Sequence, residues 1–171
     1  MVLYHAISTY HIFKFCVHKL RFHQNEEAIL LVPNFLLRKP SGVLKPNVSE
    51  IFKKVYFFEW ERKSVSSEAS VIAAVDCEMK EIINNNDLQT AKINVARAAY
   101  FFSTWLIHNK IHFQWFEEAD GRLSNPDPIM NDDQRLCPLR YEMAKKNGMY
   151  SGENPYITKK WVKFDAQVPG F

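Results

Sequence analysis

Glycine and proline are scarce in this sequence, with 5 and 8 residues out of 171. Together they fall below the share of about 12% that is usual in proteins, which excludes collagen-like and low-complexity chains. No window of 18 uncharged apolar residues occurs, so no segment is predicted to span a membrane. The first residues include His5 and His11 but no basic region, so we do not expect a signal peptide.

Excess charge and paired cysteines are also missing. Lys and Arg outnumber Asp and Glu by 22 to 19, and no basic run is interleaved with aromatic residues, so a nucleic-acid partner is not expected. Cys16, Cys77 and Cys137 are far apart and odd in number, which favours a reducing compartment over a disulfide framework. None of the six histidines has partners at metal-ligand spacing, so we expect no metal and place the histidines at the surface or at helix ends.

Short apolar runs alternate with segments of helical periodicity along most of the chain. Strands are predicted at residues 2–7, 28–32, 54–58 and 111–116, with a further one at 161–164. Helices are predicted after Ser8 and over residues 67–83, 98–108 and 138–146. Residues 92–95 are too short a run to assign, and residues 125–128 are expected to form a loop. The alternation predicts an α/β protein with a mostly parallel sheet and helices on both faces.

The first predicted helix has an apolar stripe that we expect to pack on the sheet. Its residues recur at helical spacing and are Ile12, Phe13, Cys16, Val17 and Leu20. Ligands of doubly wound sheets bind at the carboxyl ends of the strands. The loops at residues 7–10, 32–35 and 116–124 are therefore the places to look for a site.

Three carboxylates follow the strand predicted at residues 111–116. Glu117, Glu118 and Asp120 precede a turn at Gly121. Mutual repulsion and a neighbouring apolar residue raise the pKa of such a carboxyl group, as a general base requires. The alternative is an ordinary solvated loop with three acidic residues.

Ser8 and Thr9 lie where a strand runs into a helix. The free backbone N–H groups of such a helix start can bind a phosphate or a sugar hydroxyl. No glycine-rich phosphate-binding pattern accompanies them, so the competing interpretation is a simple N-cap.

Residues 3–10 and 28–33, together with the acidic segment at 116–121, resemble the start of bacterial glycosyltransferases of capsule and lipooligosaccharide synthesis. These are the sialyltransferase- and polysialyltransferase-like enzymes, including glycosyltransferase family 52. The resemblance implies a GT-B architecture, in which two Rossmann-like domains enclose the active site. It implies an acceptor-side domain over residues 1–135, followed at 136–171 by a helix and a tail that either covers this domain or links it to an absent second one.

The same resemblance implies the chemistry. An acidic motif supplies the general base that deprotonates the acceptor hydroxyl, and alignment of the motif favours Glu118 over Glu117 and Asp120. Ala119 and Asp120 separate the acidic pair from Gly121, which departs from the family pattern. The donor would be a nucleotide sugar, no bound metal or cofactor is needed, and the enzyme would be cytoplasmic with peripheral attachment to the inner membrane.

The donor-binding half of such an enzyme carries a His-Pro motif, and this dipeptide does not occur here. We therefore expect little transferase activity from this chain alone. The main alternative is a non-catalytic α/β binding or scaffold module, for which the aromatic share of 14% would form an interface, including that of a homodimer. A small hydrolase or phosphatase is less well supported, because no nucleophile lies in a glycine-bounded strand-to-helix turn.

Overall fold

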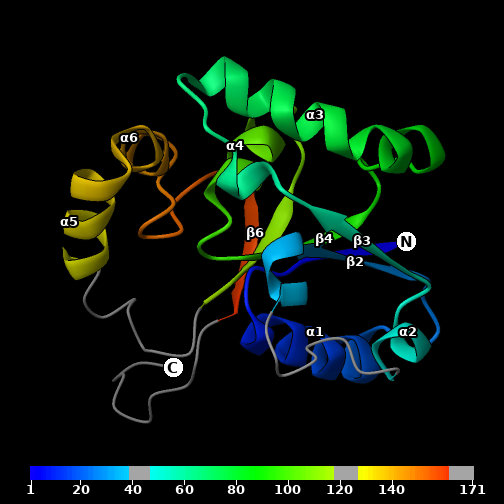
Figure 1. Cartoon of the computed structure of the whole chain (residues 1–171). Helices are drawn as coiled ribbons and strands as arrows, with labels where there is room; N and C mark the ends of the chain where they lie inside the picture. Colours follow the sequence, from blue (N-terminus) through cyan, green and yellow to red (C-terminus); the bar gives the residue numbers. More distant parts are fainter. Residues whose placement is uncertain (39–46, 118–126, 162–171) are drawn as a thin grey trace, which may run out of the picture.

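Six parallel strands form the centre of the computed structural model, which describes residues 1–38, 47–117 and 127–161 (Figure 1). The strands are β1 (Val2–His5), β2 (Ala28–Pro33), β3 (Lys54–Phe58), β4 (Lys92–Ala96), β5 (Phe113–Phe116) and β6 (Ile157–Trp161). Their order in the sheet is β3-β2-β1-β4-β5-β6, and every neighbouring pair is parallel. The predicted α/β class and Rossmann-like sheet are confirmed.

Helices cover both faces of this sheet (Figure 1). On one face lie α1 (Thr9–Phe22) and the short α2 (Asn47–Ile51). On the other face lie α3 (Glu68–Asn85) and α4 (Tyr100–His108), with α6 (Pro138–Lys146) beside α4 and α5 (Asp127–Leu136) packed against α6. Two 3-10 helices, η1 (Asn34–Arg38) and η2 (Trp60–Arg62), follow β2 and β3.

Each face of the sheet has its own apolar core. The larger core lies under α3 and α4 and includes Val75, Trp105 and Trp115. The smaller one lies under α1 and includes Tyr4 and Phe15. The strands read as nearly unbroken apolar runs because both of their faces are buried, which is usual for parallel sheets.

The strand that sequence periodicity left unassigned, β4, lies at the centre of the sheet. It pairs with β1 on one side and with β5 on the other. Its polar residue Asn94 is fully buried and donates from Nδ2 to the carbonyl of Leu3 at 3.4 Å. A polar side chain in so short a run conceals a buried strand from periodicity.

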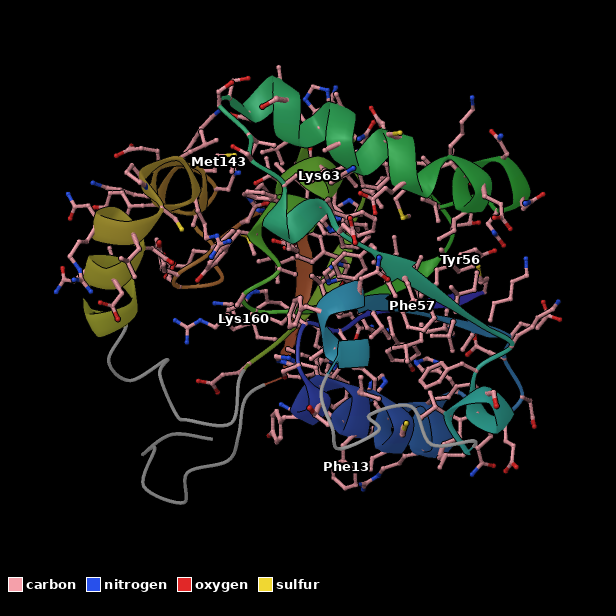
Figure 2. The ribbon with its side chains drawn as sticks, viewed as in Figure 1. Phe13, Tyr56, Phe57, Lys63, Met143 and Lys160 are labelled. Carbon is pink, nitrogen blue, oxygen red and sulfur yellow. The ribbon has the colours of Figure 1, made fainter. Side chains whose placement is uncertain are left out.

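The orientation predicted for α1 is wrong for three of its five residues. Phe13, Val17 and Leu20 are 66%, 48% and 50% exposed, and Figure 2 shows Phe13 directed away from the sheet. The buried side of the helix instead carries five residues, which are His11, Ile12, Phe15, His18 and Lys19.

Polar residues occupy that buried side because each of them finds a partner. The Tyr4 hydroxyl lies 3.0 Å from Nδ1 of His18, and Lys19 donates to the carbonyls of His23 and Gln24 at 2.6 and 2.9 Å. The buried side of the helix is therefore only partly apolar, and periodicity alone selected mainly residues of the outer side.

The C-terminal part of the described chain joins the same sheet. Of the loop predicted at residues 125–128, residues 127 and 128 lie in α5, and residues 125 and 126 lie outside the described residues. The helix α5 includes residues 135 and 136, between which the resemblance placed the end of the acceptor-side domain. The last described strand is Ile157–Trp161, which includes the first residue of the predicted strand 161–164, and it pairs with β5 at the sheet edge. Residues 162–164 of that prediction lie outside the described residues. Within the described residues, no helix has the length and apolarity needed to cross a bilayer. A second domain stays a prediction.

Candidate functional site

The carboxyl ends of all six strands lie along one edge of the sheet, because the strands are parallel. Chain connections from β1 and β4 leave this edge toward opposite faces, with α1 on one and α4 on the other. Such a reversal between neighbouring strands opens a crevice in which doubly wound proteins bind their ligands. The loops after β1 and β4 are therefore the first candidates for a site.

Ser8 caps the start of α1 at this edge of the sheet. Its Oγ accepts a hydrogen bond from the backbone N–H of His11 at 3.3 Å and lies 2.8 Å from His11 Nδ1. Burial lowers the pKa of His11 to about 4, so the imidazole is neutral at physiological pH. The N-cap interpretation of Ser8 is confirmed, and Thr9 is exposed beside it in the first turn.

Glu117 follows β5 on the same edge and is 2% exposed. Its carbonyl accepts a hydrogen bond from Nζ of Lys14 on α1 at 2.9 Å, which ties α1 to the end of β5. Burial lowers the pKa of Lys14, and the negative charge of Glu117 acts in the opposite direction. The structure thus brings Ser8, Thr9 and Glu117 to one edge, whereas Glu118, Asp120 and Gly121 lie outside the described residues.

Arg97, which sequence reasoning missed, lies directly after β4 on this edge. It is 1% exposed, and its Nη2 donates to the carbonyl of Tyr150 at 3.1 Å. The guanidinium also lies 5.6 Å from the centre of the Trp115 ring. Its Nε and Nη1 atoms have no hydrogen-bond partner within the described residues. A single Arg in a loop carries no sequence signal for such a position.

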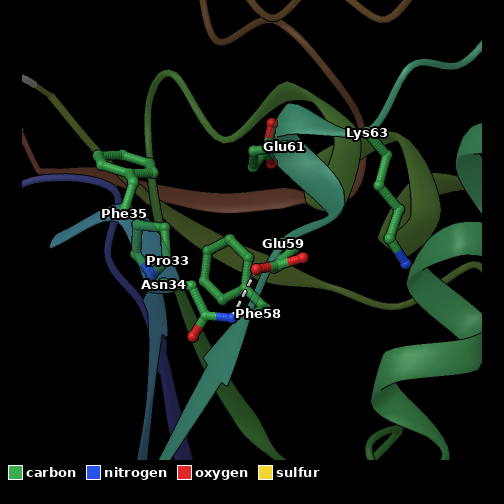
Figure 3. Close-up of a pocket in the computed structure, with 7 residues that line it drawn as sticks. All are labelled: Pro33, Asn34, Phe35, Phe58, Glu59, Glu61 and Lys63. Atoms are coloured by element: carbon green, nitrogen blue, oxygen red, sulfur yellow. Dashed lines mark hydrogen bonds between the residues drawn. The ribbon is translucent and has the colours of Figure 1, made fainter. Parts of the chain in front are cut away.

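A cavity of about 180 Å³ opens at the ends of β2 and β3 (Figure 3). Phe35 and Phe58 contribute aromatic walls, and Asn34 donates from Nδ2 to Oε1 of Glu59 at 3.0 Å. Lys63 is directed away toward α3, where its Nζ lies 2.6 Å from a carboxylate oxygen of Glu78. The Asn34 amide and the Glu59 carboxylate can hydrogen-bond to hydroxyl groups, and the aromatic rings can pack against a sugar ring. The cavity can therefore bind a polyhydroxylated molecule.

Glu61 borders this cavity and a second one of about 560 Å³ at the start of α6. Its Oε1 accepts the backbone N–H of Phe102 in the first turn of α4 at 3.3 Å, and its carbonyl accepts from Arg140 at 3.3 Å. Burial raises the pKa of the Glu61 carboxyl to about 7, against the opposing charge of Arg140. This group can therefore donate or accept a proton near neutral pH.

Three histidines that we expected at the surface or at helix ends are buried. His5, His11 and His18 are 0%, 0% and 6% exposed. Among residues 1–38, 47–117 and 127–161, no group of three or more His, Cys, Asp or Glu side chains could hold a metal ion.

In comparisons with known proteins, no family model matches this chain and no curated protein matches its sequence.

Proposed function

We propose that this chain is the acceptor-side domain of a glycosyltransferase that transfers a sugar from a nucleotide-sugar donor to a cell-surface glycan. The observation that carries the proposal is the position of Glu117. This buried carboxylate begins the acidic segment at the end of β5, on the ligand-binding edge and beside Lys14. The resemblance of residues 3–10, 28–33 and 116–121 to such enzymes supports the same function.

In this proposal a carboxylate of the acidic segment, Glu117, Glu118 or Asp120, takes the proton of the acceptor hydroxyl. The acceptor oxygen then bonds to the anomeric carbon as the bond from that carbon to the nucleotide phosphate breaks. Ser8 and Thr9 border the acceptor, together with Gly121 of the acidic segment. The reaction needs no cofactor besides the nucleotide sugar, which acts as substrate.

The donor site belongs to a second, C-terminal domain, supplied by a longer chain or by a partner. A cytoplasmic enzyme of this kind, attached peripherally to the inner membrane, would act on glycans under assembly.

Saturation-transfer NMR with capsule- and lipooligosaccharide-type oligosaccharides tests acceptor binding. The chain should bind at least one acceptor and should transfer no labelled sugar from CMP- or UDP-sugars in a single-turnover assay. Failure to bind any glycan would contradict the acceptor role, and transfer by the isolated chain would contradict the need for a second domain.

A second candidate is a non-catalytic binding module that forms a homodimer. It is favoured by the exposed apolar stripe of Phe13, Val17 and Leu20 on α1. Sedimentation equilibrium decides this point: a dimer that the substitution Val17→Lys dissociates supports the module, and a monomer at all concentrations excludes it.

A further inference from the structure

A buried cation that forms no ion pair within the described residues lies at the carboxyl edge of the sheet. Removing a guanidinium from water costs several kcal/mol unless opposite charge and hydrogen bonds compensate. Arg97 is 1% exposed, and it forms no ion pair with any acidic residue in the described part of the chain. Its Nη2 donates to the Tyr150 carbonyl, whereas Nε and Nη1 have no hydrogen-bond partner within the described residues.

The sheet register places Arg97 between the ends of β1 and β5. Val95 pairs with His5 of β1 and with Trp115 of β5. Two residues further along the parallel strands, Arg97 lies level with Ile7 and with Glu117, and the backbone N–H of Arg97 donates to the Phe116 carbonyl at 2.8 Å. Its position is thus the switch point itself, where loops from β1 and β4 separate.

The two described contacts of the guanidinium hold it in place and carry no negative charge. The Tyr150 carbonyl is an uncharged acceptor, and the Trp115 ring offers only a cation–π contact. Tyr150 is itself fixed, because its hydroxyl donates to Asp133 on α5 at 2.9 Å. A guanidinium that is held rigidly at the carboxyl edge of the sheet and has unused N–H donors can bind an anion without rearranging.

We propose that Arg97 binds an anionic group of the ligand, a carboxylate or a phosphate, at the switch point between β1 and β4. The inference rests on the proposed function and deepens it, since it gives the acceptor a negative charge at this position. The site accounts for the cost of burying Arg97, because the free protein retains a cation whose partner arrives with the ligand.

Titration of the arginine side-chain Nε–H signals by NMR tests the proposal directly. The probes are glucose 6-phosphate, glucuronate and uncharged glucose, in phosphate-free buffer. The Nε–H signal of Arg97, assigned from its loss in Arg97→Met, should shift with a charged hexose and not with glucose. The response to the phosphate and to the carboxylate shows which of the two anions the site takes.

The variants separate ligand binding from a structural role. Arg97→Met should lower the affinity for the charged hexose about tenfold or more, and it should melt at a higher temperature because an uncompensated buried charge is gone. Arg97→Lys keeps the charge and should retain part of the preference over glucose. The matched control is Arg135→Met, since Arg135 lies on α5 with its side chain 73% exposed beside Asp132.

Three results would overturn the proposal. They are equal binding of charged and uncharged hexoses by the natural chain, an unchanged preference in Arg97→Met, or a melting temperature or folding yield of Arg97→Met below that of the natural chain. The last result would mean that Arg97 is paired inside the protein. Absence of sugar transfer counts only against the glycosyltransferase proposal, because the titration uses no donor.

Discussion

The imidazole of His5 lies parallel to the phenyl ring of Phe102, with ring centroids 4.5 Å apart and planes 8° from parallel. Phe58 stacks on the imidazole as well, at 4.6 Å. Both ring nitrogens are buried and have no hydrogen-bond partner within the described residues. Burial lowers the pKa of His5 to about 3, so the folded protein holds this imidazole neutral.

We expect the free energy of unfolding to fall as the pH decreases from 6 to 5. Burial also lowers the pKa of His11 and of His18 to about 4, against ordinary values near 6.5. In this window the unfolded chain binds three protons at these histidines, whereas the folded chain does not. Glu61 has the opposite sign, since its raised pKa lets the folded chain bind one proton that the unfolded chain lacks. The net uptake of about two protons corresponds to roughly 3 kcal/mol per pH unit, measurable by urea unfolding.

His5→Leu is the control for this dependence. It removes one titrating group from the core and keeps a side chain of similar volume. The number of protons taken up on unfolding should therefore decrease by about one, and the free energy of unfolding should depend less steeply on pH. A slope that stays the same in this variant would show that His5 is not held neutral.

Glu61→Gln should be more stable than the natural chain at pH 8 and should lose this advantage toward pH 5. A carboxyl with a raised pKa stabilises the folded state below its unfolded pKa of about 4.5, and this contribution is lost as the pH rises through 7. The amide keeps an acceptor for the Phe102 N–H without a buried charge. From a shift of this size we expect roughly 3 kcal/mol at pH 8. An equal effect at both pH values would contradict the raised pKa.

Gly148→Ala should destabilise the protein strongly. Gly148 has a φ of 62°, and a Cβ there would lie 2.3 Å from the Glu153 carbonyl oxygen. The backbone conformation and the clash together should cost about 2–4 kcal/mol in thermal or urea unfolding. Gly152 is the matched control, with a φ of 66° but only the flexible end of the Lys160 side chain near its Cβ position. Equal costs for Gly148→Ala and Gly152→Ala would show that the Glu153 carbonyl moves aside.

The sequence allowed the fold class to be predicted because most strands and helices carry strong local signals. Pro33 ends β2 where it was expected to, Ser67 caps α3, and Gly148 follows α6 in the left-handed conformation expected of a C′ glycine. Prediction failed where a side-chain hydrogen bond, and not the apolar pattern, decides which side of a helix is buried. Lys19 is buried on α1 because the carbonyls beyond the helix accept its protons, and periodicity cannot show this.

The site was predictable in part. The strand-to-helix turn at Ser8 and the carboxylate at Glu117 each follow a recognisable strand, so their shared edge follows from the parallel sheet. Arg97 and Glu61 were missed because the strand before Arg97 was not assigned and Glu61 follows an edge strand without any motif. Their chemistry arises from burial against residues distant in sequence, which are Tyr150 for Arg97 and residues of α4 and α6 for Glu61.

Substitutions on the two sides of α1 should differ sharply in their effect on stability. Leu20→Ser lies on the exposed stripe and should change the free energy of unfolding by no more than about 0.5 kcal/mol. Phe15→Ala removes a ring that is 0% exposed and packs against Tyr4 and Phe116, so it should cost about 3–5 kcal/mol. Urea unfolding of both variants at protein concentrations low enough to prevent association gives the comparison. If Leu20→Ser were the costlier change, the buried side of α1 would be the one that periodicity predicts, and the exposed stripe would not exist.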